Sequence, residues 1–315
     1  MSSAARTTLW NRIRAIREAV DNPAFVSTST TTVAADASSL LRNGLAVQVY
    51  TVLEEFVRAR SLEALNHISA GYGGWAQLPE GLLRRSTMGV ASMLGGEAAR
   101  LNKTNGTAAA LALLEDTAVS WITRRNGGMQ LSELTFRWAG SNMQAEDLVD
   151  ILQAVTIEKP FESMTSIIKR FGLPLQGTVK ELLQSLARNR HSAAHAPSPG
   201  IPAVSLRSMP NDLVTLALAF DVLISRGAAA GHRSDADFRQ GKAVKVSSIG
   251  LRTVTRLHGD EWRELKVGNQ RGTRPVGSLV DVKAALLSKR AKTGDVLLFL
   301  ERDGSVSDWT TTDLP

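Results

Sequence analysis

The stretch LLRNGLAVQVYTVLEEFVRARSLE, residues 40–63, decides the fold class. Its apolar side chains Leu45, Val49, Val52 and Phe56 recur three or four residues apart, which is the spacing of one face of an α-helix. No proline interrupts the stretch. The pattern therefore predicts a long helix with one buried face.

The same periodicity predicts further helices over residues 7–20, 107–123, 144–155, 161–171, 178–194 and 211–226. We expect Asn211 or Asp212 to cap the last of these helices. Between them, the Gly-rich stretch 68–106 is expected to be irregular, apart from a short helix over 81–94. Residues 1 to about 230 are thus predicted to be mainly α.

The pattern changes after residue 235. Apolar and polar residues alternate, as in β-strands, over residues 242–247 and 251–257, and further strands are expected over 261–267, 295–301 and 305–310. The last two strands would be joined by a turn at Asp303-Gly304, and one helix is expected over 280–289. The predicted fold class is therefore mainly α, with a helical bundle followed by a small β-rich C-terminal domain. The predicted parts are an N-terminal amphipathic helix and linker (1–34), a helical domain (35–228) and a small basic β-rich domain (236–315).

The composition limits the classes of protein to which this chain can belong. The chain has 315 residues, a formal net charge of +7, a sequence pI near 10.0 and no cysteine. Because the chain has no thiol group, it cannot form disulfides, cysteine-ligated zinc sites or cysteine-ligated iron–sulfur clusters, and it cannot use a cysteine nucleophile. No apolar run reaches the roughly 20 residues of a membrane span, so we expect a soluble protein with no membrane partner. The basic charge favours a polyanionic partner such as nucleic acid.

One polar cluster is a candidate catalytic site. It reads Arg-Asn-Arg-His-Ser-Ala-Ala-His, residues 188–195, and lies at the end of a predicted helix. At about 100° per residue, Arg188, His191 and His195 lie on nearly one face, whereas Arg190 lies about 140° from His195. If Arg188 is the partner of His195, one regular helix is enough. If Arg190 is the partner, the last turn must unwind or two chains must combine. Both alternatives stay open at this point.

The cluster resembles the signature of the HEPN superfamily, in which an arginine and a polar residue precede a histidine by four to six residues. Arg190 to His195 fits this pattern with four intervening residues, and Arg188 to His195 fits it with six. Residues 41–58 are similar to the long first helix of the RiboL-PSP-HEPN branch, which carries a Tyr and a Glu before a basic end. The resemblance covers roughly residues 35–225.

This resemblance implies a HEPN-like helical bundle and a metal-independent RNA endonuclease that acts as a homodimer, without cofactor or metal. Attack by the RNA 2′-OH would leave a 2′,3′-cyclic phosphate. The resemblance assigns catalysis to Arg190, His195 and Arg188. The supporting residues are Asn189, His191, Ser192 and Glu54. Such an enzyme is expected in the cytoplasm, as a toxin or phage-defence effector restrained by an inhibitor or a trigger partner.

Other interpretations of the cluster remain. The basic side chains could simply complement the dipole at a helix C-terminus. His191 and His195 are spaced as metal ligands, but no carboxylate stands between them as in His-Glu-x-x-His. A non-catalytic HEPN-like dimer that binds a nucleotide, RNA or a protein is the main alternative to the enzyme.

Overall fold

The structure is a computed structural model that describes residues 3–22, 32–71, 73–125, 129–138, 140, 142–195, 200–257, 259, 261–266, 277–290, 295–311 and 314. In the first part of the chain, the elements are α1 (Ala4–Val20), α3 (Thr32–Gly71), a 3-10 helix (Trp75–Gln77), α4 (Glu80–Arg84), a π-helical turn (Arg85–Gly89), α5 (Val90–Asn105), α6 (Thr107–Arg125) and the 3-10 helix η3 (Glu133–Phe136). Then follow α7 (Ala145–Ala154), α8 (Pro160–Phe171), α9 (Val179–His195), α10 (Ala203–His232), α11 (Ala236–Arg239), a 3-10 helix (Val246–Ser248), β1 (Leu251–Arg256), β2 (Trp262–Lys266), α12 (Leu279–Arg290), β3 (Val296–Leu300) and β4 (Val306–Thr311). The predicted fold class, mainly α with a small sheet near the C-terminus, is confirmed.

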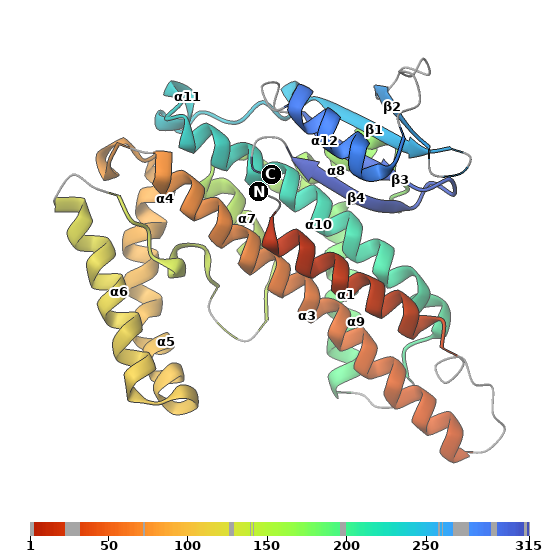
Figure 1. Ribbon diagram of the computed structural model, residues 1–315. Helices are drawn as coiled ribbons and strands as arrows, with labels where there is room; N and C mark the ends of the chain where they lie inside the picture. The colour runs from red at the N-terminus through yellow and green to blue at the C-terminus, as the bar shows by residue number, and fades with distance from the viewer. Residues whose placement is uncertain are drawn as a thin grey trace.

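The long helices α3 and α10 form the centre of the bundle and run in the same direction (Figure 1). The predicted helix 40–63 is confirmed as part of α3, whose Phe56 packs edge-on against Phe220 of α10 with ring centroids 6.5 Å apart. α1 runs antiparallel to both. Near its start the Ala5 amide donates to Glu63, toward the C-terminal end of α3, and near its end Arg17 donates to Asn211, in the N-terminal half of α10. The apolar face of α3 therefore lies at the centre of the core.

α10 differs from its prediction. It begins at Ala203 and continues through Pro210, so neither Asn211 nor Asp212 caps it. A proline inside a helix destabilises it by about 3 kcal/mol, whereas burial of one large apolar side chain stabilises the fold by about 1.5–3 kcal/mol. Because α10 buries many such side chains, the helix continues through Pro210. By length and composition α10 is also the one described helix that could cross a membrane. However, 89% of its most apolar window is buried inside the protein, as in a core helix.

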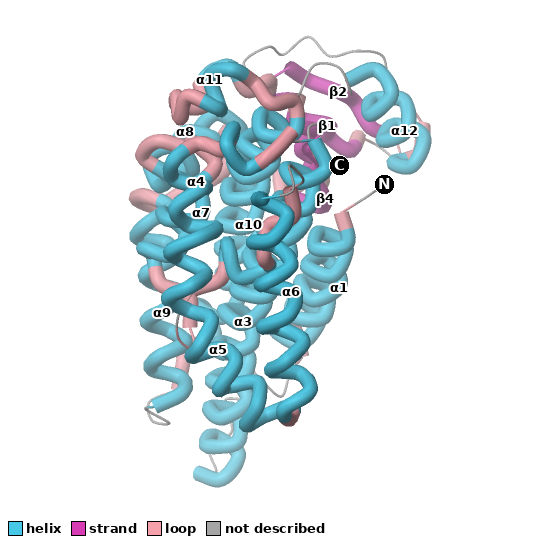
Figure 2. The backbone as a smooth tube through the Cα atoms, turned by 90° about the vertical axis from the view of Figure 1, so that its left-hand side faces the viewer, coloured by secondary structure: helices cyan, strands magenta, loops and turns pink. Residues whose placement is uncertain are grey.

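The Gly-rich stretch is mostly helical rather than irregular. α5 passes through Gly95 and Gly96 without a break. It pairs with α6 as a hairpin that stands beside the main bundle (Figures 1 and 2), and Val90, Leu113 and Leu134 form a small hydrophobic cluster there. Packing against α6 stabilises a helix that two glycines, at about 1 kcal/mol each, would otherwise weaken.

The four strands form one sheet in the order β2-β1-β3-β4, with β1 and β3 parallel and the outer pairs antiparallel. The strands predicted over 251–257, 261–267, 295–301 and 305–310 are thus present. Residues 242–247 do not form a strand; a 3-10 turn at Val246–Ser248 stands there instead. Gly304 has a φ of 81° in the predicted turn between β3 and β4, a conformation that glycine adopts without strain.

The two faces of the sheet have different neighbours. Leu297 and Phe299 of β3 pack under α12, whereas Leu298 between them belongs to the core of the helical bundle. Trp309 of β4 joins that same core, with its ring 5.3 Å from Trp10 and 6.4 Å from Phe56 between centroids. The three-part division of the chain stays a prediction, but the sheet and the helices share one hydrophobic core.

Candidate functional site

The Arg/His cluster lies at the C-terminal end of α9. The helix begins with a reciprocal cap, in which the Thr178 amide donates to Glu181 at 2.7 Å and the Glu181 amide donates to the Thr178 hydroxyl at 3.2 Å. Val179, Leu183 and Leu186 are buried along one face, toward α3 and α8. The remaining faces of the last turns carry the polar residues of the cluster.

Four of the predicted site residues share the exposed face of α9. Arg188, His191, Ser192 and His195 are all exposed. The rings of His191 and His195 are in contact, with centroids 4.7 Å apart and planes inclined by 51°. Within the described part of the chain, none of the four side chains makes a hydrogen bond or an ion pair. We call Arg188, His191, Ser192 and His195 the Arg/His face.

Arg190 lies on another side of α9, next to α3. It is partly buried, and its charge acts on Glu54 and on Tyr50. The Glu54 carboxylate accepts the Met143 amide at 2.5 Å, and the Tyr50 hydroxyl donates to the Met143 carbonyl at 2.6 Å. Burial raises the pKa of Glu54, against the opposing effects of the Met143 amide and of Arg190. Burial also raises the pKa of Tyr50, and the neighbouring Glu54 adds to this effect.

The two arginines therefore have different surroundings. Because α9 stays regular to His195, Arg188 shares a face with His195, and Arg190 instead faces Glu54. Asn189 is partly buried between the two sides. The structure thus brings Arg188 together with His191, Ser192 and His195, and it brings Arg190 together with Glu54. Residues 196–199, which include Pro197 and Pro199, lie outside the described residues.

Among the residues that the structure describes, no three His, Cys, Asp or Glu side chains gather where they could hold a metal ion. His191 and His195 thus remain a pair without a described carboxylate as third ligand.

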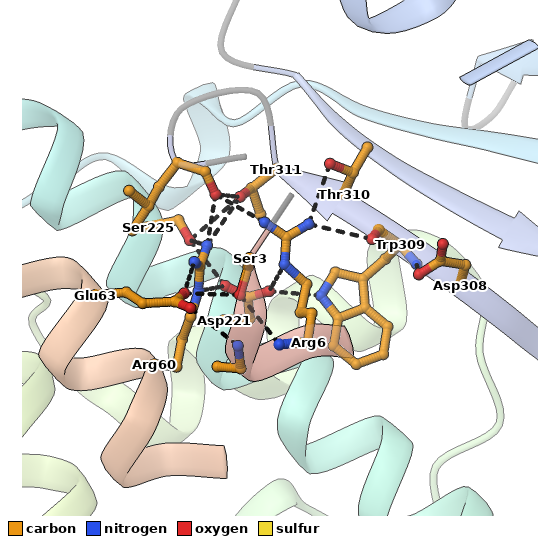
Figure 3. Close-up of polar contacts among 12 residues, drawn as sticks. Ser3, Arg6, Arg60, Glu63, Asp221, Ser225, Asp308, Trp309, Thr310 and Thr311 are labelled. Carbon is orange, nitrogen blue, oxygen red and sulfur yellow. Dashed lines mark hydrogen bonds and ion pairs between the residues drawn. The ribbon is translucent and has the colours of Figure 1, made fainter. Parts of the chain in front are cut away.

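A buried ionic network that the sequence did not reveal connects the two ends of the chain (Figure 3). At its centre Asp221 of α10 is fully buried and accepts from Arg60 Nε at 2.6 Å and from Trp309 Nε1 at 2.7 Å. Arg6 Nε lies 3.1 Å from the same carboxylate. Although burial by itself raises the pKa of Asp221, the two guanidinium groups and the indole hold it below its usual range.

Arg60 extends this network to the C-terminus. Its guanidinium donates to Glu63 at 2.5 Å, to Ser225 at 2.8 Å and to the Leu314 carbonyl at 2.6 Å. Arg60 has no exposed surface, so solvent and substrate cannot reach it. We therefore regard the network of Arg6, Arg60, Glu63 and Asp221 as a structural element that joins α1, α3, α10 and β4, and not as a reactive site.

Three arginines that the sequence did not single out, Arg58, Arg100 and Arg137, line one cavity. They come from α3, from α5 and from the segment after η3, and no local motif connects them. The only sequence signal was the excess of basic residues.

Comparison of the chain with protein-family models, with curated proteins and with solved structures gives no match. The HEPN resemblance therefore continues to rest on the residues quoted from the sequence, and the roles of the site residues stay predictions.

Proposed function

We propose that this protein is a metal-independent RNA endonuclease of the HEPN type that acts as a homodimer. The observation that supports it most is the Arg/His face, where two imidazoles and a guanidinium are exposed together without a partner in the described part of the chain. A helix end that only capped its own carbonyl groups would not need two contacting histidines beside an exposed arginine. The net charge of +7 fits an RNA substrate.

RNA supplies its own nucleophile for this reaction. A base removes the proton of the 2′-OH, the 2′-oxygen forms a bond to phosphorus, and the bond from phosphorus to the 5′-oxygen breaks while an acid protonates that oxygen. The products are a 2′,3′-cyclic phosphate and a 5′-hydroxyl. Imidazole exchanges protons near neutral pH, which suits His195 to either role. Arg188 supplies a permanent positive charge and a bidentate fork for the crowded phosphorane.

The dimer follows from the geometry of the displacement. The attacking and departing oxygens lie on opposite sides of the phosphorus in an in-line reaction. His191 and His195 lie one turn apart on the same face of α9, with ring centroids 4.7 Å apart, so we expect both rings to approach a phosphate from the same side. His195 of a second copy would therefore provide the proton transfer on the opposite side, and each Arg/His face would form half of the site.

Arg190, Glu54 and Asn189 have a supporting role in this proposal. Glu54 is fixed by the Met143 amide and faces Arg190, so this pair orients the last turns of α9 from behind the Arg/His face. These residues are positioning residues. We place the enzyme in the cytoplasm, where an inhibitor protein or a trigger restrains it as in toxin or phage-defence systems.

The test is cleavage of a mixed RNA by the purified protein in EDTA, with identification of the product ends. His195→Ala is expected to lower the rate by roughly 10²- to 10⁴-fold, the usual contribution of a general acid or base. Arg239→Ala, which removes an exposed charge from α11, is the control and should leave the rate unchanged. Equal cleavage by the His195→Ala variant would contradict the proposed site.

The second candidate function is a dimeric HEPN-like module that binds RNA, a nucleotide or a protein without cutting. The exposed position of His195 at the end of α9 favours this alternative, because a catalytic histidine is usually enclosed in a cleft. In that case a folded, dimeric protein would bind RNA and leave it intact, and Arg188→Ala would weaken binding. Cyclic-phosphate products from the wild type would exclude this alternative.

A further inference from the structure

A cavity of about 740 Å³ lies between α3, α5 and the segment that contains and follows η3. Its wall includes Arg58 of α3, Glu97 and Arg100 of α5, and Arg137 and Trp138 after η3. We call these five residues the arginine pocket. None of them belongs to the Arg/His face, so the pocket is a separate feature of the molecule.

Glu97 holds two of the arginines in place. Its carboxylate accepts from Arg100 at 2.5 and 3.0 Å and contacts Arg137 Nη2 at 2.7 Å. The hydrogen bonds from Arg100, followed by the charge of Arg137, hold the pKa of Glu97 below its usual range, so this carboxylate stays ionised at neutral pH. Arg137 also reaches Glu133, but only at 3.8 Å and at an exposed position. One partly buried carboxylate thus positions two guanidinium groups.

Arg58 has a different kind of support. Its guanidinium lies over the ring of Trp138, 4.7 Å from the centroid, and within the described part of the chain it makes no hydrogen bond or ion pair. Partial burial, and after it the charge of Arg137, lower the pKa of Arg58, while the charges of Glu54 and Glu97 act in the opposite direction. Glu54, one turn before Arg58, offsets part of this charge, but its carboxylate is already bound to the Met143 amide. The N–H groups of Arg58 remain available for an anion.

The charge and shape of the pocket identify the kind of anion. Three guanidinium groups and one carboxylate leave a net charge of +2, which the dianion of a phosphate monoester matches. Met93, Leu134 and Trp138 add an apolar wall, which suits a flat base. The volume falls in the usual range of small-molecule sites, about 300–1,000 Å³. We propose that the arginine pocket binds a nucleotide through its terminal phosphate.

The nucleotide could be free or the phosphorylated end of an RNA strand, since both present the same group. The proposal does not depend on RNA cleavage, because it uses no residue of the Arg/His face.

Calorimetric titration of the full chain tests the proposal. The probes are adenosine 5′-monophosphate, adenosine, inorganic phosphate, and a short RNA with and without a 5′-phosphate. We expect adenosine 5′-monophosphate or the 5′-phosphorylated RNA to bind at least about tenfold more tightly than its counterpart without phosphate, since a charged hydrogen bond contributes on that scale. Arg58→Gln should weaken this binding by roughly tenfold. If adenosine 5′-monophosphate binds, the ligand is a free nucleotide. If only the 5′-phosphorylated RNA binds, the ligand is the end of an RNA strand.

Arg207→Gln is the matched control, because it removes the same charge from an exposed position on α10. Thermal unfolding of each variant checks that it folds; Arg58 is exposed, so its replacement should leave the fold intact. The proposal is overturned if the wild type binds none of the phosphorylated probes, or binds them no better than the forms without phosphate. It is also overturned if Arg58→Gln binds like Arg207→Gln.

Discussion

Two groups of basic side chains in this protein differ in nearly every respect except their chemistry. Arg6 and Arg60 are buried around Asp221, whereas Arg188 and the histidines of its face are exposed without a described partner. The first group comes from positions far apart in the sequence, and the second is nearly contiguous. In this protein the basic residues that are contiguous in the sequence lie on an exposed surface, whereas Arg6 and Arg60, which are far apart in the sequence, meet in the buried core.

The difference has an energetic basis. A buried charge must be compensated by partners, because its removal from water costs several kcal/mol. An exposed charge keeps its hydration, and even an ion pair there contributes only about 0–1 kcal/mol. Substitutions in the buried network should therefore change stability, and substitutions on the Arg/His face should change function alone.

The largest effect is expected for Asp221→Ala. It leaves Arg6 and Arg60 without their shared carboxylate, and removing one partner of a buried ion pair usually costs about 3–5 kcal/mol. The free energy of unfolding, measured by urea denaturation, checks this value. The control is Asp150→Ala, which breaks an exposed ion pair with Arg85 and should cost at most about 1 kcal/mol. Similar losses for both variants would contradict the comparison.

The next effect depends on pH. Although burial by itself raises the pKa of Glu63, hydrogen bonds from the Ala5 amide, Ser3 and Arg60 hold it below its usual range. A carboxylate with a lowered pKa stabilises the folded state at pH values above its unfolded pKa of about 4.3, and this contribution is lost as the pH falls through the folded value. We expect unfolding free energies measured from pH 7 to pH 3 to fall less steeply for Glu63→Gln than for the wild type. Parallel curves would rule out this role of Glu63.

A smaller effect is expected for Trp309→Phe. The substitution removes the hydrogen bond from the indole to Asp221 and leaves space beside Trp10 and Phe56. Lost hydrogen bonding and packing together should cost about 1–3 kcal/mol. Urea denaturation gives this value, and an unchanged midpoint would mean that Asp221 finds another donor.

The smallest effect on stability is expected for Arg188→Ala and His195→Ala. Neither side chain has a hydrogen bond or ion pair within the described residues, so the free energy of unfolding should stay within about 0.5 kcal/mol of the wild type. The same two proteins should lose RNA cleavage. If either variant were strongly destabilised, the Arg/His face would be part of the fold and not a free surface.

The sequence predicted most helices because their buried faces follow the helical period, as α3 and α8 illustrate. It failed where tertiary contacts outweigh local preferences. Gly95 and Gly96 lower helix propensity, yet α5 stays helical against α6. The sequence predicted a helix that begins near Asn211, yet α10 begins at Ala203 and continues through Pro210, because its side chains are buried. Residues 242–247 alternate as a strand does but find no partner strand among the described residues.

For the candidate site, the sequence located the Arg/His face and its helical geometry. It left open which arginine faces His195, and the regular course of α9 to His195 puts Arg188 there. It also missed the arginine pocket, since Arg58, Arg100 and Arg137 meet only after the hairpin packs beside α3.

By itself, the sequence determined the fold class, the absence of thiol chemistry, the basic charge and the contiguous Arg/His face. These features are composition or local periodicity, which follow from residue order alone. Only the tertiary structure decided that Asp221 would bind two arginines, that Arg190 would face Glu54 and that three arginines would surround one cavity. Such contacts join residues far apart in the chain, and they form because a buried or crowded charge must find a partner once the helices pack.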